Sequence, residues 1–113
     1  MIEIQPISNI DAAIEVPGSK SLTQRALIAA SLANGTSRLL GPLESEDTQY
    51  SSSALMQMGI AMDKGQEWLI HGKGGLIQPS KEPIFLGNNG TATRFLTSVA
   101  SLGNSKYTID GGP

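Results

Sequence analysis

Apolar and polar residues alternate at the beginning of the chain, and this pattern predicts short strands. Ile2, Ile4 and Ile7 are separated by polar residues, and residues 13–16 form a second short run that ends at a Pro-Gly pair. A period of two is typical of a strand with one apolar face. We therefore predict two strands before residue 18.

Three later segments have the composition and the stop signals of helices. Apolar residues recur at roughly helical spacing over residues 21–33, 45–58 and 91–102. A glycine closes each segment, and Ser45 or Asp47 can cap the second one. Short strands are predicted at residues 36–40 and 106–110, and a hairpin at residues 60–71.

The same order of elements recurs three times: each predicted helix ends at a glycine, and a short strand follows it. This repetition suggests a stack of similar β/α units with helices packed under sheets. The predicted fold class is α/β. A chain of 113 residues suits one domain or part of a larger one.

Composition narrows the class of function. The chain is 39% hydrophobic and 16% charged, which is typical of a globular protein, and its formal net charge is −2. We expect no nucleic-acid partner, since the sequence lacks a strongly basic field. There is no cysteine and no long apolar run, so we expect neither a thiolate metal site nor a membrane partner, and a cytoplasmic location.

The first candidate site is the loop Pro17-Gly18-Ser19-Lys20-Ser21, which leads into the first helix. The first amides of a helix are unpaired and carry partial positive charge, and Lys20 and Arg25 add full charges near them. Cations at a helix start oppose its dipole by roughly 0.3–1 kcal/mol each. We therefore expect a bound phosphate or carboxylate to reverse the local field.

A second loop repeats this arrangement. Gly87-Asn88-Asn89-Gly90-Thr91 precedes the third helix, with Arg94 in its first turns. Two such loops indicate two anionic groups or two substrates. Neither loop has the spacing of a P-loop or of a dinucleotide fingerprint. From the residues alone, an anion-binding α/β domain and a pair of solvated surface turns both stay open.

Longer motifs carry a family resemblance. VPGSKSLTQRAL (residues 16–27) and LGNNGTATR (residues 86–94) resemble the two N-terminal signatures of the EPSP synthases, the 3-phosphoshikimate 1-carboxyvinyltransferase family. ESEDT (residues 44–48) is similar to the acidic segment between them. The resemblance implies the enolpyruvyl transferase fold, built from βαβαββ-type units. Residues 1–113 would then be an incomplete N-terminal portion of the N-terminal domain, about half of it.

The resemblance also implies roles for individual residues. Lys20 would contact both phosphoenolpyruvate and shikimate 3-phosphate, and Ser21 and Arg25 would hold shikimate 3-phosphate. Gly90 would approach phosphoenolpyruvate through its backbone amide. Asn88 and Asp47 would line the same cleft, with Arg94 in support, and Lys20 and Asp47 are the only possible contributors to catalysis.

The implied reaction joins the enolpyruvyl group of phosphoenolpyruvate to the 5-hydroxyl of shikimate 3-phosphate, with release of phosphate. No metal or organic cofactor is expected, and the complete enzyme is expected to be a monomer. Further groups of the site would come from the remainder of the enzyme, so we expect no turnover by these 113 residues alone.

Two positions depart from the common family pattern. Asn89 stands where many members have a small residue, and Phe95 stands where many have proline. Both are expected beside the phosphoenolpyruvate pocket, where the family inhibitor glyphosate also binds, so the usual sensitivity cannot be assumed.

Three alternatives remain at this point: a non-catalytic module that captures a phosphorylated metabolite, a structural piece that works only with another chain, and a relative of the enolpyruvyl transferase that acts on UDP-N-acetylglucosamine. Lys20 followed by Ser21, and Gly112 followed by Pro113, disfavour the last of these.

Overall fold

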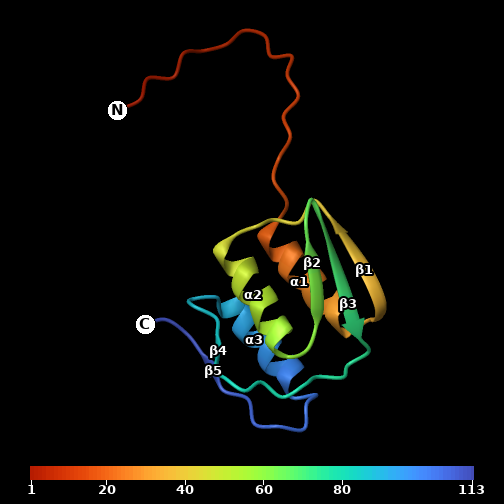
Figure 1. Ribbon diagram of the computed structural model, residues 1–113. Coiled ribbons are helices and arrows are strands. Elements are labelled where there is room, and N and C mark those ends of the chain that lie inside the picture. Colours follow the sequence, from red (N-terminus) through yellow and green to blue (C-terminus); the bar gives the residue numbers. More distant parts are fainter.

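The computed structural model describes residues 1–113 and contains three helices and five strands. The helices are α1 (Lys20–Leu32), α2 (Glu46–Gln57) and α3 (Gly90–Ala100). The strands are β1 (Asn34–Leu40), β2 (Ala61–Lys64), β3 (Glu67–Lys73), β4 (Ile84–Phe85) and β5 (Ile109–Asp110). Figure 1 shows the helices beside a small sheet, which confirms the α/β prediction. No helix is long and apolar enough to cross a membrane.

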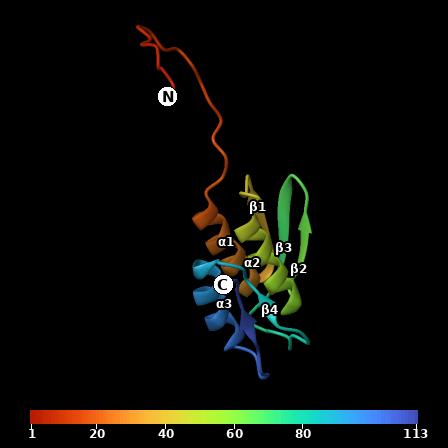
Figure 2. The same cartoon turned by 90° about the vertical axis from the view of Figure 1, so that its left-hand side faces the viewer.

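The larger sheet has the order β1-β3-β2 and is antiparallel throughout. Trp68 and Ile70 of β3 are buried, whereas His71 lies on the outer face of the sheet between Thr36 of β1 and Asp63 of β2. Figure 2 shows this sheet on one side of the helices. The alternation in β3 therefore separates a helix-covered face from an exposed one.

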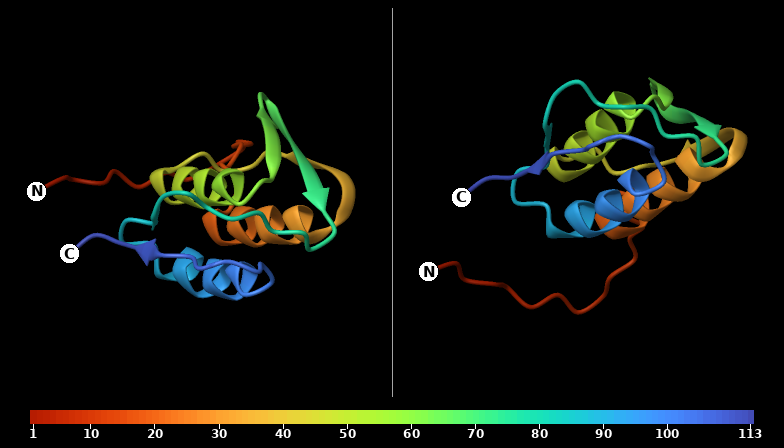
Figure 3. Two further views of the ribbon diagram at one scale, coloured as in Figure 1. Left: turned by 60° about the horizontal axis from the view of Figure 1, so that its bottom comes forward. Right: turned by 90° about the horizontal axis from the view of Figure 1, so that it is seen from below.

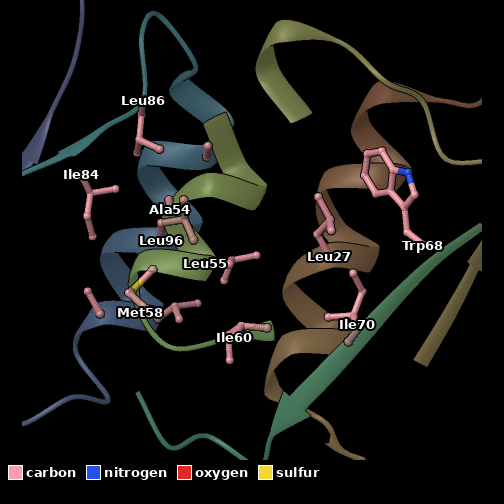
Figure 4. Close-up of a cluster of buried hydrophobic side chains, with 14 residues drawn as sticks. Leu27, Ala54, Leu55, Met58, Ile60, Trp68, Ile70, Ile84, Leu86 and Leu96 are labelled. Atoms are coloured by element: carbon pink, nitrogen blue, oxygen red, sulfur yellow. The ribbon is translucent and has the colours of Figure 1, made fainter. Parts of the chain in front are cut away.

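The core joins the sheet to all three helices. Figure 4 shows Leu27 of α1 facing Trp68 and Ile70, with residues of α2, α3 and β4 beside them. Each of these labelled side chains is at most 2% exposed. Gly72 lets β3 pass close to the end of α1, because a Cβ there would lie 2.4 Å from the Ala30 carbonyl oxygen. Burial of this apolar cluster is the main force that holds the layers together.

The helices lie parallel, with their N-termini at one end of the molecule. Figure 3 shows the beginnings of α1, α2 and α3 on the same side, together with the two ends of the chain. The three helices contact one another pairwise. This arrangement places the two glycine loops, which precede α1 and α3, at the same end.

The two strands predicted before residue 18 are wrong for this structure. Residues 1–17 form an extended segment without strand pairing that leaves the body of the molecule, as Figure 1 shows. Its large apolar side chains are between 71% and 89% exposed from Ile2 to Val16. A strand needs a neighbour for its backbone hydrogen bonds, and no other segment lies beside this one.

The predicted strand at residues 106–110 is shorter than expected. Only Ile109 and Asp110 form β5, which pairs in parallel with Ile84 and Phe85 of β4. Proline at residue 83 and Gly87 bound the partner strand, so it offers only two residues for pairing. The other predicted elements are confirmed, with ends shifted by one or two residues at most positions.

Candidate functional site

The first loop forms the N-cap of α1. Ser19 is extended, and its Oγ accepts a hydrogen bond from the Leu22 amide at 3.3 Å. The amides of Lys20 and Ser21 make no hydrogen bond, so they remain as free donors at the helix start. A Cβ on Gly18 would lie 2.3 Å from the Gly41 carbonyl oxygen, which explains the glycine. The loop is thus packed closely against residues 41–43.

Thr23 fixes this packing from within the helix. Its hydroxyl donates to the Ser19 carbonyl at 2.8 Å and accepts from the Leu43 amide at 2.9 Å. Thr23 is only 6% exposed. The loop that carries Lys20 is therefore anchored to the segment that leads into α2.

Lys20 makes an ion pair with the first turn of α2. Its Nζ lies 2.8 Å from Asp47 Oδ2, and the two side chains are 56% and 31% exposed. The unfavourable charge of Lys20 at a helix start is therefore balanced within the chain, where the sequence had suggested a bound anion. An exposed pair of this kind contributes at most about 1 kcal/mol, so a stronger anion can displace Asp47.

The start of α2 has a capping box around this aspartate. Ser45 Oγ accepts from the Thr48 amide at 3.3 Å, and Thr48 Oγ1 accepts from the Ser45 amide at 2.9 Å. The amides of Glu46 and Asp47 are left without partners. The predicted cap at Ser45 is confirmed, and Asp47 lies inside the helix, where its charge favours the dipole.

The second loop forms the start of α3. Gly87 has φ +56°, and a Cβ there would lie 2.7 Å from the Tyr50 ring. The Gly90 amide donates to the Asn88 carbonyl at 3.1 Å, whereas the Thr91 amide makes no hydrogen bond. Asn88 is exposed, and Arg94 folds back so that its Nη1 donates to the Gly90 carbonyl at 3.3 Å. The amides of Gly87 and Asn88 also make no hydrogen bond, so Thr91 is one of three free backbone donors in this loop.

The Asn89 side chain lies inside the protein. Its side chain is only 4% exposed and caps α3, because Oδ1 accepts from the Ala92 amide at 2.9 Å. Its Nδ2 donates to the Asp47 carbonyl at 3.0 Å. The side chain therefore points into the contact between α2 and α3 and does not line an open pocket. Asparagine immediately before an apolar helix is a sequence signal for this cap.

The last residues of the chain hold the second loop in place. The Leu86 amide donates to the Asp110 carbonyl at 2.9 Å, and the Gly112 amide donates to the Gly87 carbonyl at 3.0 Å. A Cβ on Gly112 would lie 3.3 Å from Asn88 Oδ1. The short β4–β5 pair thus fixes the loop that precedes α3.

Arg25 follows Lys20 by five residues in α1 and is not paired with Asp47. It lines a shallow apolar groove between α1 and α3 together with Ile28, Ala29 and Phe95. Arg25 is exposed and makes no ion pair. Its guanidinium is therefore available to an anion, as is the exposed hydroxyl of Ser21 one turn earlier.

Tyr50 is a neighbour of the site that the sequence did not single out. Its hydroxyl donates to Glu46 Oε1 at 2.9 Å, and its ring packs edge-on against Phe85 with the centroids 5.5 Å apart. The hydrogen bond to the Glu46 carboxylate, together with burial and the nearby acidic charges, raises the pKa of Tyr50 above 10.0. The spacing of four residues between Glu46 and Tyr50 could have indicated this contact.

Known proteins match the chain over the residues that form this fold and this site. The family model described as EPSP synthase (3-phosphoshikimate 1-carboxyvinyltransferase) matches residues 4–113. A curated 3-phosphoshikimate 1-carboxyvinyltransferase of Rhizobium leguminosarum is 53% identical over 97 residues, which is 84% of this chain and 23% of that protein. One of Methanothermobacter thermautotrophicus is 41% identical over 108 residues, covering 96% of this chain and 26% of that protein.

Solved structures agree with these relatives. The EPSP synthase of Acinetobacter baumannii superimposes with a TM-score of 0.81 at 30% identity, over 87% of this chain and 23% of that chain. The chain thus spans about a quarter of the length of the relatives it matches. On the extent of the family match and the shared fold, the chain belongs to the EPSP synthase (3-phosphoshikimate 1-carboxyvinyltransferase) family.

Proposed function

We propose that the chain forms part of a 3-phosphoshikimate 1-carboxyvinyltransferase and supplies one wall of its substrate cleft. One observation carries this proposal: the starts of α1, α2 and α3 lie at one end of the molecule, with Lys20 and Asp47 paired among them. Helix starts with free amides and cations favour phosphates and carboxylates. Both proposed substrates, phosphoenolpyruvate and shikimate 3-phosphate, carry such groups.

In this proposal, the chain brings together two anions that repel each other. Lys20 contacts both substrates, while Ser21 and Arg25 hold shikimate 3-phosphate. The free amides of Lys20 and Ser21, and the exposure of Arg25, support this role. Positive groups held in fixed positions lower the cost of bringing the 5-hydroxyl next to the enol carbon.

Phosphoenolpyruvate is assigned to the start of α3, near Gly90, Asn88 and Arg94. The free Thr91 amide supports an anion there, whereas the Gly90 amide must leave the Asn88 carbonyl before it can bind one. Asp47 lines the cleft between the two substrates. When a substrate phosphate takes Lys20, Asp47 is released as a carboxylate beside the reacting groups.

The chain is proposed to form about half of the N-terminal domain, and the remainder of the enzyme to complete the cleft. The exposed apolar residues between Ile2 and Val16 support this, because such a segment is stabilised when another surface covers it. We further infer that the complete enzyme acts as a monomer in the cytoplasm, which size-exclusion chromatography and cell fractionation can test.

A chimeric synthase tests the function directly. This segment would replace the matching quarter of the Rhizobium leguminosarum relative, and phosphate release from the two substrates would be measured. We expect turnover by the chimera and a large loss on Lys20→Ala, with Lys106→Ala as the control, since Lys106 is exposed and distant from the helix starts. An inactive but folded chimera would contradict the proposal.

A second candidate, a module that captures a phosphorylated metabolite without chemistry, rests on the poor supply of acid–base groups here. Asp47 is the carboxylate paired at the helix starts, and it is already engaged by Lys20. Calorimetry of the 113-residue chain with shikimate 3-phosphate distinguishes the two: binding by the chain with an inactive chimera would favour capture.

A further inference from the structure

Asn89 has every polar group of its side chain and backbone engaged. Besides capping Ala92 and reaching the Asp47 carbonyl, its Nδ2 lies 3.4 Å from the Ser51 hydroxyl. Its backbone carbonyl accepts from both the amide and the hydroxyl of Thr93, at 3.0 and 2.9 Å, and its amide donates to Leu86 at 3.1 Å. A buried side chain bound on all sides has one available orientation.

The partners of Asn89 belong to two different helices. Oδ1 holds the first turn of α3, and Nδ2 holds the first two turns of α2 through Asp47 and Ser51. Ser51 also donates to the Asp47 carbonyl, at 3.0 Å. The amide group therefore fixes the start of α3 against the start of α2.

Asp47 extends this connection to α1. Its carbonyl accepts from Asn89, and its carboxylate pairs with Lys20 at 2.8 Å. A continuous path of contacts thus runs from the cation of the first loop to the residue immediately before Gly90 in the second. Loss of the Asn89 amide would leave only apolar packing between α2 and α3 to set this spacing.

A shorter N-cap side chain could not both cap α3 and reach the Asp47 carbonyl. Serine at position 89 would still accept from the Ala92 amide, because serine is a good N-cap, but its hydroxyl would not reach the Asp47 carbonyl at the same time. The cap and the bridge can therefore be separated by substitution.

We infer that Asn89 is a positioning residue, which sets the backbone of Gly90 and Thr91 against the Lys20–Asp47 pair. The inference rests on the proposed function for its consequence in catalysis. Asn89 does not touch substrate, since its side chain is buried. It acts by holding the phosphoenolpyruvate loop at a fixed place relative to the shikimate 3-phosphate loop.

The chimeric synthase described above supplies the test. Asn89→Ser keeps the cap and removes the bridge, Asn89→Ala removes both, and Thr97→Ala removes a hydrogen bond to the Thr93 carbonyl within α3. We expect Asn89→Ser to unfold at nearly the parental temperature. Because a displaced Gly90–Thr91 loop loses contacts to its ligand in the ground state, we expect its KM for phosphoenolpyruvate to rise by about tenfold or more.

Comparing the KM values for the two substrates separates a positioning role of Asn89 from a general loss of stability. KM for phosphoenolpyruvate should rise more than KM for shikimate 3-phosphate, and Thr97→Ala should change neither. Parental KM values in Asn89→Ser would overturn the inference, as would equal rises for both substrates that follow the loss of stability.

A crystal structure of the Asn89→Ser chimera makes the inference independent of turnover. We expect Gly90 to be displaced relative to Lys20 when compared with the parent. An unmoved Gly90 would overturn the positioning role even if activity fell. An inactive parent would instead refute the proposed function and leave this structural comparison to decide the role of Asn89.

Discussion

Asp47 Oδ2 lies 2.8 Å from Lys20 Nζ, so the cation of the first glycine loop has an internal counter-ion before any ligand arrives. The carboxylate is therefore in the place that a substrate anion is proposed to take. Binding must exchange one anion for another, and the strength of the ion pair limits the affinity.

The exchange predicts that Asp47→Asn raises the affinity of the 113-residue chain for inorganic phosphate. The amide keeps the size of the side chain but no longer competes for Lys20. We expect a change of a few fold, because exposed pairs contribute about 0.2–1 kcal/mol. Titration calorimetry at low and high salt measures it, with Asp63→Asn as the control on the outer face of the sheet; equal affinity for both variants would contradict the exchange.

The raised pKa of Tyr50 predicts that the folded protein loses stability in alkaline solution. Its pKa is raised in the folded state, chiefly by the hydrogen bond to Glu46, so the folded state holds the phenolic proton more tightly than the unfolded state does. This contribution is present below pH 10.0 and is lost as the pH rises through the folded pKa.

Denaturant unfolding at increasing pH, together with absorbance titration of tyrosinate, checks this prediction. Tyr50→Phe should remove the alkaline loss that is due to this group. Tyr107→Phe is the control, because the Tyr107 hydroxyl donates to the Gln78 carbonyl and not to a carboxylate. An unchanged pH profile in Tyr50→Phe would refute the assignment.

The backbone conformation and close packing of Gly87 predict that adding a single methyl group there lowers the stability of the protein. Alanine there would have φ +56° and a Cβ 2.7 Å from the Tyr50 ring. We expect Gly87→Ala to lower the free energy of unfolding by about 1–3 kcal/mol. Gly65→Ala is the matched control, since the nearest atom to its Cβ would be 3.8 Å away; similar unfolding midpoints for the two variants would exclude this strain.

The buried side-chain amide of Gln24 predicts that an apolar substitution there does not destabilise the protein. It is 2% exposed in α1, and its Nε2 has no hydrogen-bond partner. Because an unpaired buried donor costs about 1–3 kcal/mol, Gln24→Leu should leave the free energy of unfolding unchanged or raise it. Gln49→Leu, on the exposed face of α2, is the control, and a clear loss of stability in Gln24→Leu alone would show that the amide is needed.

Much of the fold could be predicted from local signals. Ser45 and Gly59 marked the limits of α2, and the residues around Trp68 marked the β2–β3 hairpin. These signals depend on neighbours within a few residues, so they are visible in sequence. The strands expected near Ile4 and Ile14 could not form, because alternation creates an apolar face but does not supply a partner strand.

The candidate site was predictable by residue type but not by contact. The loops identified Lys20 and Gly90, yet the pairing of Lys20 with Asp47 depends on how α1 and α2 pack, which no local pattern specifies. For the same reason the sequence did not show that the packing of α2 on α3 turns the Asn89 amide inward.

Because α1, α2 and α3 are parallel, their dipoles point in the same direction. Each helix places about half a positive charge at its N-terminus, so the three partial charges add at their common end. An anion bound at this end is therefore stabilised by the helix starts as well as by Lys20. The association rate of a phosphorylated ligand should therefore fall with ionic strength even in a protein that lacks the Lys20 charge.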